Sequence, residues 1–313
     1  MKYVEFVNDL IKKEVAQRDN LLLFGQNINA GSYLSGLTRN IELKKGSRII
    51  NTQNSENSLV GFGFGLMING ISSVYFMKQM DFLLLGIDQL VNTYGFIRNL
   101  YGTKNKASFS IVATVYDDGY QGVQSSLNTF GDFCSIGRIP GFAITNSADA
   151  KKIISSELVS PGFRIIGLSL RLYKSEIIVP GRIISLGERN AFSQYSDGKD
   201  ATIVCFNFSF PYGWEFYSRL KEKKIEASLF NVNSMNPIGW DYILRNAAKT
   251  QKLVIIDDSK SANLTGDNLA AHAGQNKAIK KIIFLKRKLG KNWLNPVADQ
   301  MDINYEKVIK ELK

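Results

Sequence analysis

The order of apolar and polar positions along this chain predicts repeated units of helix and strand. Residues 3–18 carry apolar side chains near helical spacing, and the short apolar run LLLFG at 21–25 follows as a buried strand. The polar, glycine-bearing stretch 26–41 is then a loop, and RIIN at 48–51 is a second short strand. The chain therefore opens with the elements of a parallel sheet.

An unusual helix is predicted next, over 59–67. Every second residue from 61 to 65 is glycine, among aliphatic and aromatic residues. Glycine costs helix stability unless it allows a close approach, so we expect close packing here. Glu56 stands just ahead of this helix. In one interpretation it lies in a first turn capped by Asn54 or Ser55, where the helix dipole favours an acid.

The following residues repeat the alternation of strand and helix. Strands are predicted at 72–76, 109–115 and 164–170, and a long amphipathic helix at 81–100. Residues 142–159 read as a strand, an Asn/Ser cap and a helix. This pattern predicts an α/β fold, with an open, mainly parallel sheet covered by helices on both faces.

A second, smaller unit follows a stretch without helical periodicity. We predict a linker near 175–200 and place the boundary so that the domains are 1–185 and 186–313. Both are expected to be open αβα domains, each with its own core. The second series is predicted as strands at 201–208, 225–232, 252–258 and 278–285 and helices at 214–224, 239–250, 266–274 and 304–313.

Length and composition are those of a two-domain globular protein. The chain has 313 residues, about twice the typical domain size. No apolar run reaches the ~20 residues needed to cross a bilayer, and the charged opening is unlike a signal peptide. Cys134 and Cys205 each lie in an apolar segment and read as buried free thiols. We therefore expect a cytoplasmic protein without membrane contact.

The formal charge of +11 is compatible with two interpretations. Lysine and arginine are densest at 277–291, which is either a solvated basic face or a surface for an anionic partner or substrate. No nucleic-acid-binding module accompanies the charge, so nucleic acid is not expected as a partner. His272 is the only histidine, and we expect a structural role for it.

Five features, in order along the chain, match the motifs of one known family. They resemble the beta subunits of thiamine diphosphate-dependent 2-oxo acid dehydrogenases, whose two-domain plan is shared with the second half of transketolase. The resemblance implies a pyrimidine-binding domain followed by a transketolase C-terminal-type domain. The matching features are Tyr3 with Asn8 and Leu10, RIINTQNSE at 48–56, GIDQLVN at 86–92, RIPGFAITNSADAKKII at 138–154 and LRLY at 170–173.

The resemblance gives Glu56 a catalytic role. The matching family glutamate hydrogen-bonds the cofactor's pyrimidine ring and favours the imino tautomer, which takes the proton from the thiazolium carbon. Such chemistry needs one acid held in an apolar wall that excludes water. The resemblance also implies that Asn54, Gln79 and Phe82 bind the cofactor. Gln79 replaces an aromatic residue of the family, which weakens the expected aromatic wall.

The loop expected to face the substrate departs from the family. Its members carry a histidine there, whereas residues 114–141 contain none. The polar replacements available include Gln121, Gln124 and Ser125, which are our candidate substrate residues. Either the substrate chemistry differs, or a partner subunit supplies the missing group, or the activity is lost.

The family's diphosphate and Mg²⁺ motif, a GDG followed later by an asparagine, is also missing. The nearest sequence, TGDN at 265–268, lies in the second domain and lacks the second glycine. No metal ligands are therefore predicted on this chain. The resemblance implies that thiamine diphosphate bridges to an alpha-type partner subunit that holds Mg²⁺, with two copies of each chain. The glycine-rich helix is expected at a subunit interface or, alternatively, packed on the sheet.

Three functions remain open. The preferred one is cleavage and transfer at the carbonyl of a small ketone or 2-oxo acid, with dehydrogenase-like decarboxylation favoured. Transketolase-like transfer of a ketol or acyl group to a sugar or aldehyde is the alternative. The third possibility is a non-catalytic interaction subunit that kept the fold and the interface.

Overall fold

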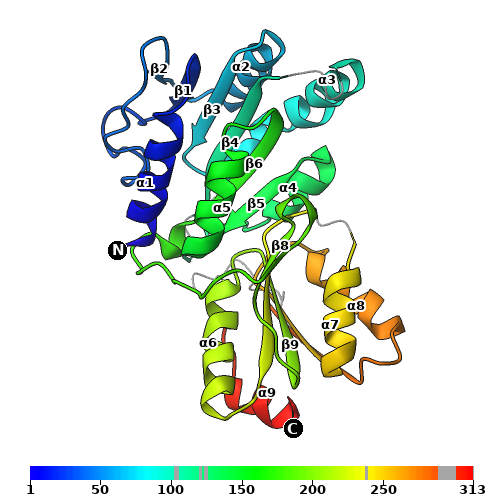
Figure 1. The fold of residues 1–313 in the computed structure, drawn as a ribbon. Helices are drawn as coiled ribbons and strands as arrows, with labels where there is room; N and C mark the ends of the chain where they lie inside the picture. Colours follow the sequence, from blue (N-terminus) through cyan, green and yellow to red (C-terminus); the bar gives the residue numbers. More distant parts are fainter. Residues whose placement is uncertain (102–105, 120–121, 123–125, 237–238, 288–300, 313) are drawn as a thin grey trace.

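The first sheet of the computed structural model is entirely parallel and positions the candidate site (Figure 1). The structure describes residues 1–101, 106–119, 122, 126–236, 239–287 and 301–312. The strand order is β2-β1-β3-β4-β6-β5. The strands are β1 Leu21–Gly25, β2 Arg48–Asn51, β3 Ser72–Met77, β4 Ser108–Val115, β5 Gly141–Ile144 and β6 Gly162–Ser169.

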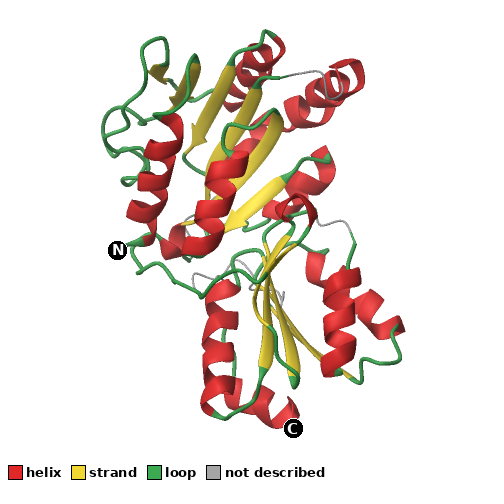
Figure 2. Cartoon of the chain, in the orientation of Figure 1, coloured by secondary structure: helices red, strands yellow, loops and turns green. Residues whose placement is uncertain are grey.

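Helices cover both faces of this sheet, as the strand and helix alternation predicted (Figure 2). On one face α1 (Tyr3–Val15) packs beside α5 (Ser147–Glu157). The other face carries the glycine-rich helix and its neighbours. These are α2 Glu56–Ile68, η1 Met80–Gly86, η2 Gln89–Thr93, α3 Tyr94–Tyr101 and α4 Phe130–Gly137.

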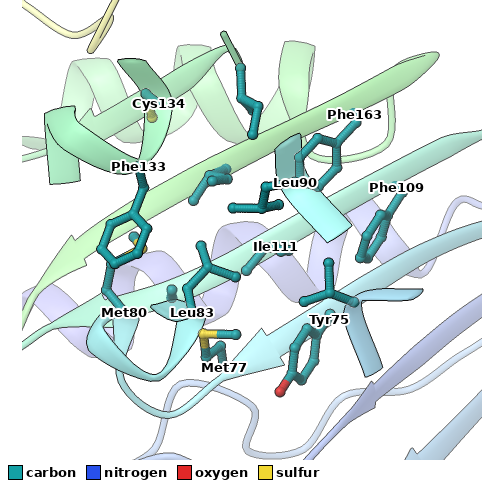
Figure 3. Close-up of a cluster of buried hydrophobic side chains, with 14 of the residues drawn as sticks. Tyr75, Met77, Met80, Leu83, Leu90, Phe109, Ile111, Phe133, Cys134 and Phe163 are labelled. Carbon is teal, nitrogen blue, oxygen red and sulfur yellow. The ribbon is translucent and has the colours of Figure 1, made fainter. Parts of the chain in front are cut away.

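The core beneath α2 is aromatic. Figure 3 shows Tyr75, Phe109 and Phe163 from three neighbouring strands together with Leu83 of η1, and all four are almost fully buried. The Phe109 and Phe163 rings are 5.0 Å apart, centroid to centroid. Burying rings of this size is a main source of stability for the face that carries α2.

The second sheet is mixed, with the order β12-β11-β9-β10-β8-β7. Four strands are parallel, and β8 and β7 form an antiparallel hairpin at one edge. The strands are β7 Ser185–Leu186, β8 Phe192–Ser196, β9 Ala201–Phe206, β10 Ala227–Val232, β11 Lys252–Asp257 and β12 Lys281–Lys286.

Two helices pack on each face of the second sheet, which confirms the predicted two-domain α/β fold. Buried side chains of α6 and α9 share one core, and those of α7 and α8 share the other. The helices are α6 Phe210–Glu222, α7 Asp241–Thr250, α8 Thr265–Gln275 and α9 Tyr305–Leu312. Both cysteines are buried and free, as expected.

The linker prediction was wrong in part. Residues near 175–200 include β7 and β8, and β8 pairs antiparallel with β10. Ser193 and Gln194 of β8 are buried although they are polar, because hydrogen bonds satisfy them. A strand with buried polar residues has no apolar alternation, so the sequence pattern concealed it.

Two helical predictions on the α2 side also need correction. The expected continuous helix at 81–100 changes from a 3₁₀ segment to a π segment before α3 begins. The change follows Gly86, where an added Cβ would lie 3.0 Å from Val60 Cγ2 of α2. Helix α4 was not predicted, because it has only eight residues and follows a polar loop.

Buried polar contacts join the two domains. Ala143 N donates to Asn233 O at 2.9 Å, and Asn231 Nδ2 donates to the Asp149 carboxylate at 2.8 Å. Arg171 Nη2, after β6, contacts Asp258 Oδ2, after β11, at 2.8 Å. The two domains therefore form an interface with specific hydrogen bonds and an ion pair. In the part of the chain that the structure describes, we find no helix with the length and apolar character of a membrane span.

Candidate functional site

The candidate site lies at the carboxyl edge of the first sheet. Strand β2 leads to Glu56, β3 leads to Gln79 and Phe82, and β4 leads to Tyr116. Strand β1 has β2 on one side and β3 on the other, so the strand order reverses here. In open α/β sheets, ligands bind in the crevice at such a reversal, outside the carboxyl ends of the strands.

Glu56 is the first residue of α2 and is only 9% exposed. Among the described residues, no hydrogen bond or ion pair reaches its carboxylate. Ser55 is the N-cap residue, but it makes no side-chain cap hydrogen bond, so the proposed capping by Asn54 or Ser55 is not observed. Glu56 thus lies at the positive end of the helix dipole with its oxygens free to accept a ligand hydrogen bond.

Aromatic side chains pack under α2, the helix that Glu56 begins. Burial and, secondarily, the negative charge of Glu56 raise the pKa of the Tyr75 hydroxyl above its ordinary value. The Tyr75 ring stacks on Phe24 with 5.0 Å between ring centroids. Sequence reasoning missed Tyr75, although its place in the strand that follows α2 was a usable signal. Tyr75 and Phe24 are 3% and 0% exposed, so this aromatic pair belongs to the core beneath the site.

The other predicted cofactor residues lie on the same edge with different exposure. Gln79 is 7% exposed, and its side chain lies near the hydroxyl of Tyr116. Phe82 is half-buried at the start of η1, and Asn54 is exposed in the loop before Glu56. The sheet edge thus gathers the predicted set, and it adds Tyr116, which the sequence did not single out.

The candidate substrate residues Gln121, Gln124 and Ser125 lie outside the described residues, but both ends of their loop are held firmly. Asp117 accepts hydrogen bonds from Ser169 Oγ at 2.6 Å and from Arg171 N at 3.0 Å. Burial raises the pKa of Asp117, and the nearby Arg171 guanidinium opposes that shift.

The second end of this loop is bound to the other domain. Lys260 Nζ donates to Ser126 O at 2.7 Å, and Asn128 Nδ2 donates to Asp258 O at 2.8 Å. The loop therefore begins on contacts within the first domain and ends on contacts with the second.

The three glycines of α2 have different surroundings. A Cβ at Gly63 would come 2.2 Å from the Phe109 ring, so glycine is required for α2 to pack on the sheet. A Cβ at Gly61 would meet Gln89 at 3.3 Å, whereas nothing lies within 4 Å of one at Gly65. Close packing is confirmed at two positions, and Gly65 leaves an open surface.

That open surface is apolar. The elements on this face of the sheet expose large hydrophobic side chains, several of them more than 60% exposed. Several large exposed apolar side chains on one face of a domain are typical of an interaction site. We call it the α2–α3 patch, and its residues are Phe62, Ile68, Leu84, Leu85, Val91, Phe96 and Leu100.

His272 lies in the second domain, away from the first sheet. It is exposed on α8, and its Nδ1 hydrogen-bonds Asn268 O at 2.8 Å. No group of three or more His, Cys, Asp or Glu suited to a metal ion occurs within the described ranges.

This architecture is the two-domain α/β plan of transketolase-like proteins, and comparisons with known proteins agree. No family model matches the chain. Over 281 residues, 86% of this chain and 82% of the relative, it is 23% identical to the acetoin:2,6-dichlorophenolindophenol oxidoreductase subunit beta of Cupriavidus necator. Over 264 residues, 82% of this chain and 78% of the relative, it is 26% identical to the pyruvate dehydrogenase E1 component subunit beta of Mesostigma viride.

A solved structure shows the same fold over nearly the whole chain. It is a split gene transketolase in the form of an inactive beta4 tetramer, matched with a TM-score of 0.69 and 16% identity over 98% of this chain and 95% of that one. The predicted resemblance to beta subunits of 2-oxo acid dehydrogenases, with a transketolase-like fold, is confirmed.

Proposed function

We propose that this chain is the beta-type subunit of a two-subunit thiamine diphosphate-dependent enzyme. It binds the pyrimidine ring of the cofactor and activates it for cleavage and transfer at the carbonyl of a ketone or 2-oxo acid. We assign this role to domain 1–185, joined to the C-terminal domain 186–313, in a cytoplasmic complex.

The position of Glu56 carries the proposal. The residue is 9% exposed, its carboxylate has no hydrogen-bond or ion-pair partner among the described residues, and it begins α2 at the edge where the strand order reverses. A carboxylate shielded from water and free of ion pairs can hold or accept a proton at a bound heterocycle. Glu56 would therefore hydrogen-bond a ring nitrogen of the pyrimidine.

The neighbouring residues fit a flat heterocycle. Half-buried Phe82 offers an apolar surface, and the largely buried Gln79 places an amide group near the Tyr116 hydroxyl. Asn54, exposed just ahead of Glu56, would close the pocket. When bound, thiamine diphosphate would supply the carbon nucleophile and electron sink for cleavage next to a carbonyl.

A partner subunit is part of this proposal. The diphosphate and Mg²⁺ would be held by an alpha-type subunit, with two copies of each chain in the complex. The exposed α2–α3 patch supports this assignment. It lies on the face of the first sheet that carries α2, the helix that begins with Glu56. Its side chains are large and apolar, such as Phe96, which is 68% exposed. Without the partner, the chain is expected to be inactive.

The reaction we favour is decarboxylation of a 2-oxo acid with transfer of the acyl group, since the curated relatives include a pyruvate dehydrogenase beta subunit. The alternative is ketol transfer to a sugar or aldehyde, as the transketolase likeness suggests. Gln121, Gln124 and Ser125 remain our candidates for substrate contacts.

The test is turnover by the reconstituted complex. A panel of 2-oxo acids is assayed for decarboxylation beside sugar phosphates for ketol transfer, with thiamine diphosphate and Mg²⁺ present. Decarboxylation that requires both subunits and is lost in Glu56→Gln supports the favoured reaction. Ketol transfer alone would favour the alternative, and no turnover of either kind would leave the non-catalytic interaction subunit as the better account.

A further inference from the structure

A small cavity lies at the boundary between the two domains, away from Glu56. Figure 1 shows α4 at this boundary, and α4 forms the wall that the first domain contributes. The segments after β9, β10 and β11 and the start of α8 form the other walls. The volume is about 180 Å³, below the roughly 300 Å³ at which cofactor-sized sites begin. The cavity therefore suits a small ligand.

Negative charge faces this cavity without a matching positive charge. Asp132, in the first turn of α4, and Asp257, at the end of β11, line it, and none of the described lining residues is Lys, Arg or His. Within the described ranges, neither carboxylate takes part in an ion pair. Lys260 is near in sequence, but it does not line the cavity, and its Nζ donates to Ser126 O at 2.7 Å.

Asp257 keeps acceptor capacity after its structural bonds are made. It is 1% exposed, and its oxygens accept the backbone N–H of Ser259 at 3.0 Å and of Gly266 at 3.2 Å. The second bond holds the start of α8. A carboxylate has about four acceptor positions, so these bonds leave others open. Burial raises the pKa of Asp257 to about 7, and a cation beside the carboxylate would oppose that shift.

An independent unsatisfied acceptor belongs to Asn207, which lines the cavity and is 5% exposed. Its Nδ2 donates to Asn128 Oδ1 at 2.9 Å and to Asp258 Oδ1 at 3.0 Å, so these bonds fix which end of the amide is the oxygen. Its Oδ1 is buried and has no hydrogen-bond partner in the part of the chain that the structure describes. A buried acceptor left unpaired costs about 1–3 kcal/mol. A ligand that donates a hydrogen bond would remove this cost.

The lining offers few donors in return. Asn236 Nδ2 is already used, because it donates to Cys134 O at 2.8 Å and to Ile139 O at 2.9 Å. Asn263 is the one further amide among the described lining residues, and it is exposed. The other polar side chains of the lining are hydroxyl groups, which can accept as well as donate. A matching ligand is therefore positively charged and rich in donors.

We infer that this cavity binds a small amine through its ammonium group, held by the carboxylates of Asp132 and Asp257 with Asn207 as a further acceptor. An ammonium group has three donors and no acceptor, which complements this lining. A metal ion fits less well, because the described ranges contain no group of three or more His, Cys, Asp or Glu suited to hold one. The inference does not depend on Glu56 or on the cofactor.

The experiment measures binding to the full chain by ligand-observed NMR, without turnover. The probes are methylammonium, ethanolamine and ethylene glycol, which is the uncharged match of ethanolamine. We expect at least one amine to bind and ethylene glycol to be weaker by about 10-fold or more, as loss of a charged hydrogen bond implies. K⁺ and Mg²⁺ are then added at equal ionic strength. Displacement of the amine by either ion at an equal or lower concentration would indicate a metal site and overturn the inference, as would no binding of either amine.

Removing the two carboxylate charges should abolish most of the affinity. Asp132→Asn with Asp257→Asn is expected to weaken amine binding by about 10-fold or more. Asp241→Asn is the matched control, because Asp241 is also an exposed aspartate in the first turn of a helix but does not line the cavity. Unchanged affinity in the double variant, or an equal loss in the control, would refute the assignment.

A variant that keeps both carboxylates tests the site from the opposite direction. Asn263→Lys attaches an ammonium group to an exposed lining position, where it should compete with the free amine and weaken its binding by about 10-fold or more. Asn263→Gln controls for side-chain length and should leave the affinity within about twofold of the original. Thermal melting confirms that each variant folds. Amine binding by Asn263→Lys as tight as that of the original chain would contradict the inference.

Discussion

The two domains share one layout, but they use the carboxyl edges of their sheets differently. In the first domain this edge carries a largely buried, unpaired Glu56 and opens onto a cavity of about 780 Å³. In the second domain the same edge is committed to the interface: Asp258 accepts from Arg171, Asn207 and Phe208 N. The first edge offers the larger cavity, and the second mainly holds the domains together.

We propose that the first domain carries the chemistry and that the second domain supports it. Asp258 and Asn128 tie the second domain to the end of the loop that carries the candidate substrate residues. A change in the interface should therefore act on stability first, and a change at the first edge should act on function. The following predictions test that division, from the largest expected effect to the smallest.

Removing Arg171, the cation at the interface between the domains, should destabilise the folded protein. Arg171→Met leaves the buried carboxylates of Asp117 and Asp258 without their shared partner, and we expect a loss of about 3–5 kcal/mol in unfolding free energy. The measurement is urea unfolding. Lys223→Met breaks an exposed pair with Glu306 and serves as the control, with an expected loss of at most about 1 kcal/mol. Equal losses in the two variants would contradict the proposed role of the interface.

Asp257, a buried carboxylate at the end of β11 in the second sheet, should make the stability of the folded protein depend on pH. Burial raises the pKa of Asp257 to about 7, so between about pH 4 and 7 the folded protein binds a proton that the unfolded chain releases. Stability contributed by this group is complete below about pH 4 and should fall by roughly 2.5 kcal/mol between pH 5 and 7.5. Asp257→Asn should flatten that slope in urea unfolding, and an unchanged slope would show that Asp257 is not responsible.

The glycines of α2 provide a matched pair. Gly63→Ala places a Cβ 2.2 Å from the Phe109 ring and should cost about 2 kcal/mol through overpacking. Gly65→Ala meets no atom within 4 Å and should stabilise the helix by about 0.5–1 kcal/mol. Thermal unfolding of the chain without a partner measures both. The same sign for both substitutions would mean that α2 packs differently.

The α2–α3 patch should affect assembly more than folding. Leu85→Ser with Phe96→Ser removes two side chains that are 65% and 68% exposed, and we expect at least 10-fold weaker association with the alpha-type subunit, about 1.4 kcal/mol. Analytical ultracentrifugation measures the association. Leu186→Ser, 51% exposed on β7, is the control. If the control weakens association as much as the double variant, the partner binds elsewhere.

The sequence predicted most strands and helices because their burial follows regular apolar spacing. It missed β8, whose buried Ser193 and Gln194 depend on hydrogen bonds from distant residues. Glu56 could be proposed from the sequence because its surroundings in the chain match a family motif, and its catalytic role stays a prediction. Tyr75 was missed although its strand was predicted, and Tyr116 and the cavity could not be identified, since they follow from how β4, β6 and α1 meet in space.

Glu56 is the central residue of the proposed function, and hydrogen–deuterium exchange at the thiazolium carbon of thiamine diphosphate tests its role most directly. Exchange is followed by NMR in the complex of this chain with its alpha-type subunit, with Mg²⁺ present. We expect Glu56→Gln to slow the exchange by roughly 100-fold or more, as loss of a positioned acid does. Glu42→Gln, an exposed acid in the loop before β2, should exchange at the original rate. Unchanged exchange in Glu56→Gln would contradict the catalytic role and support a non-catalytic subunit.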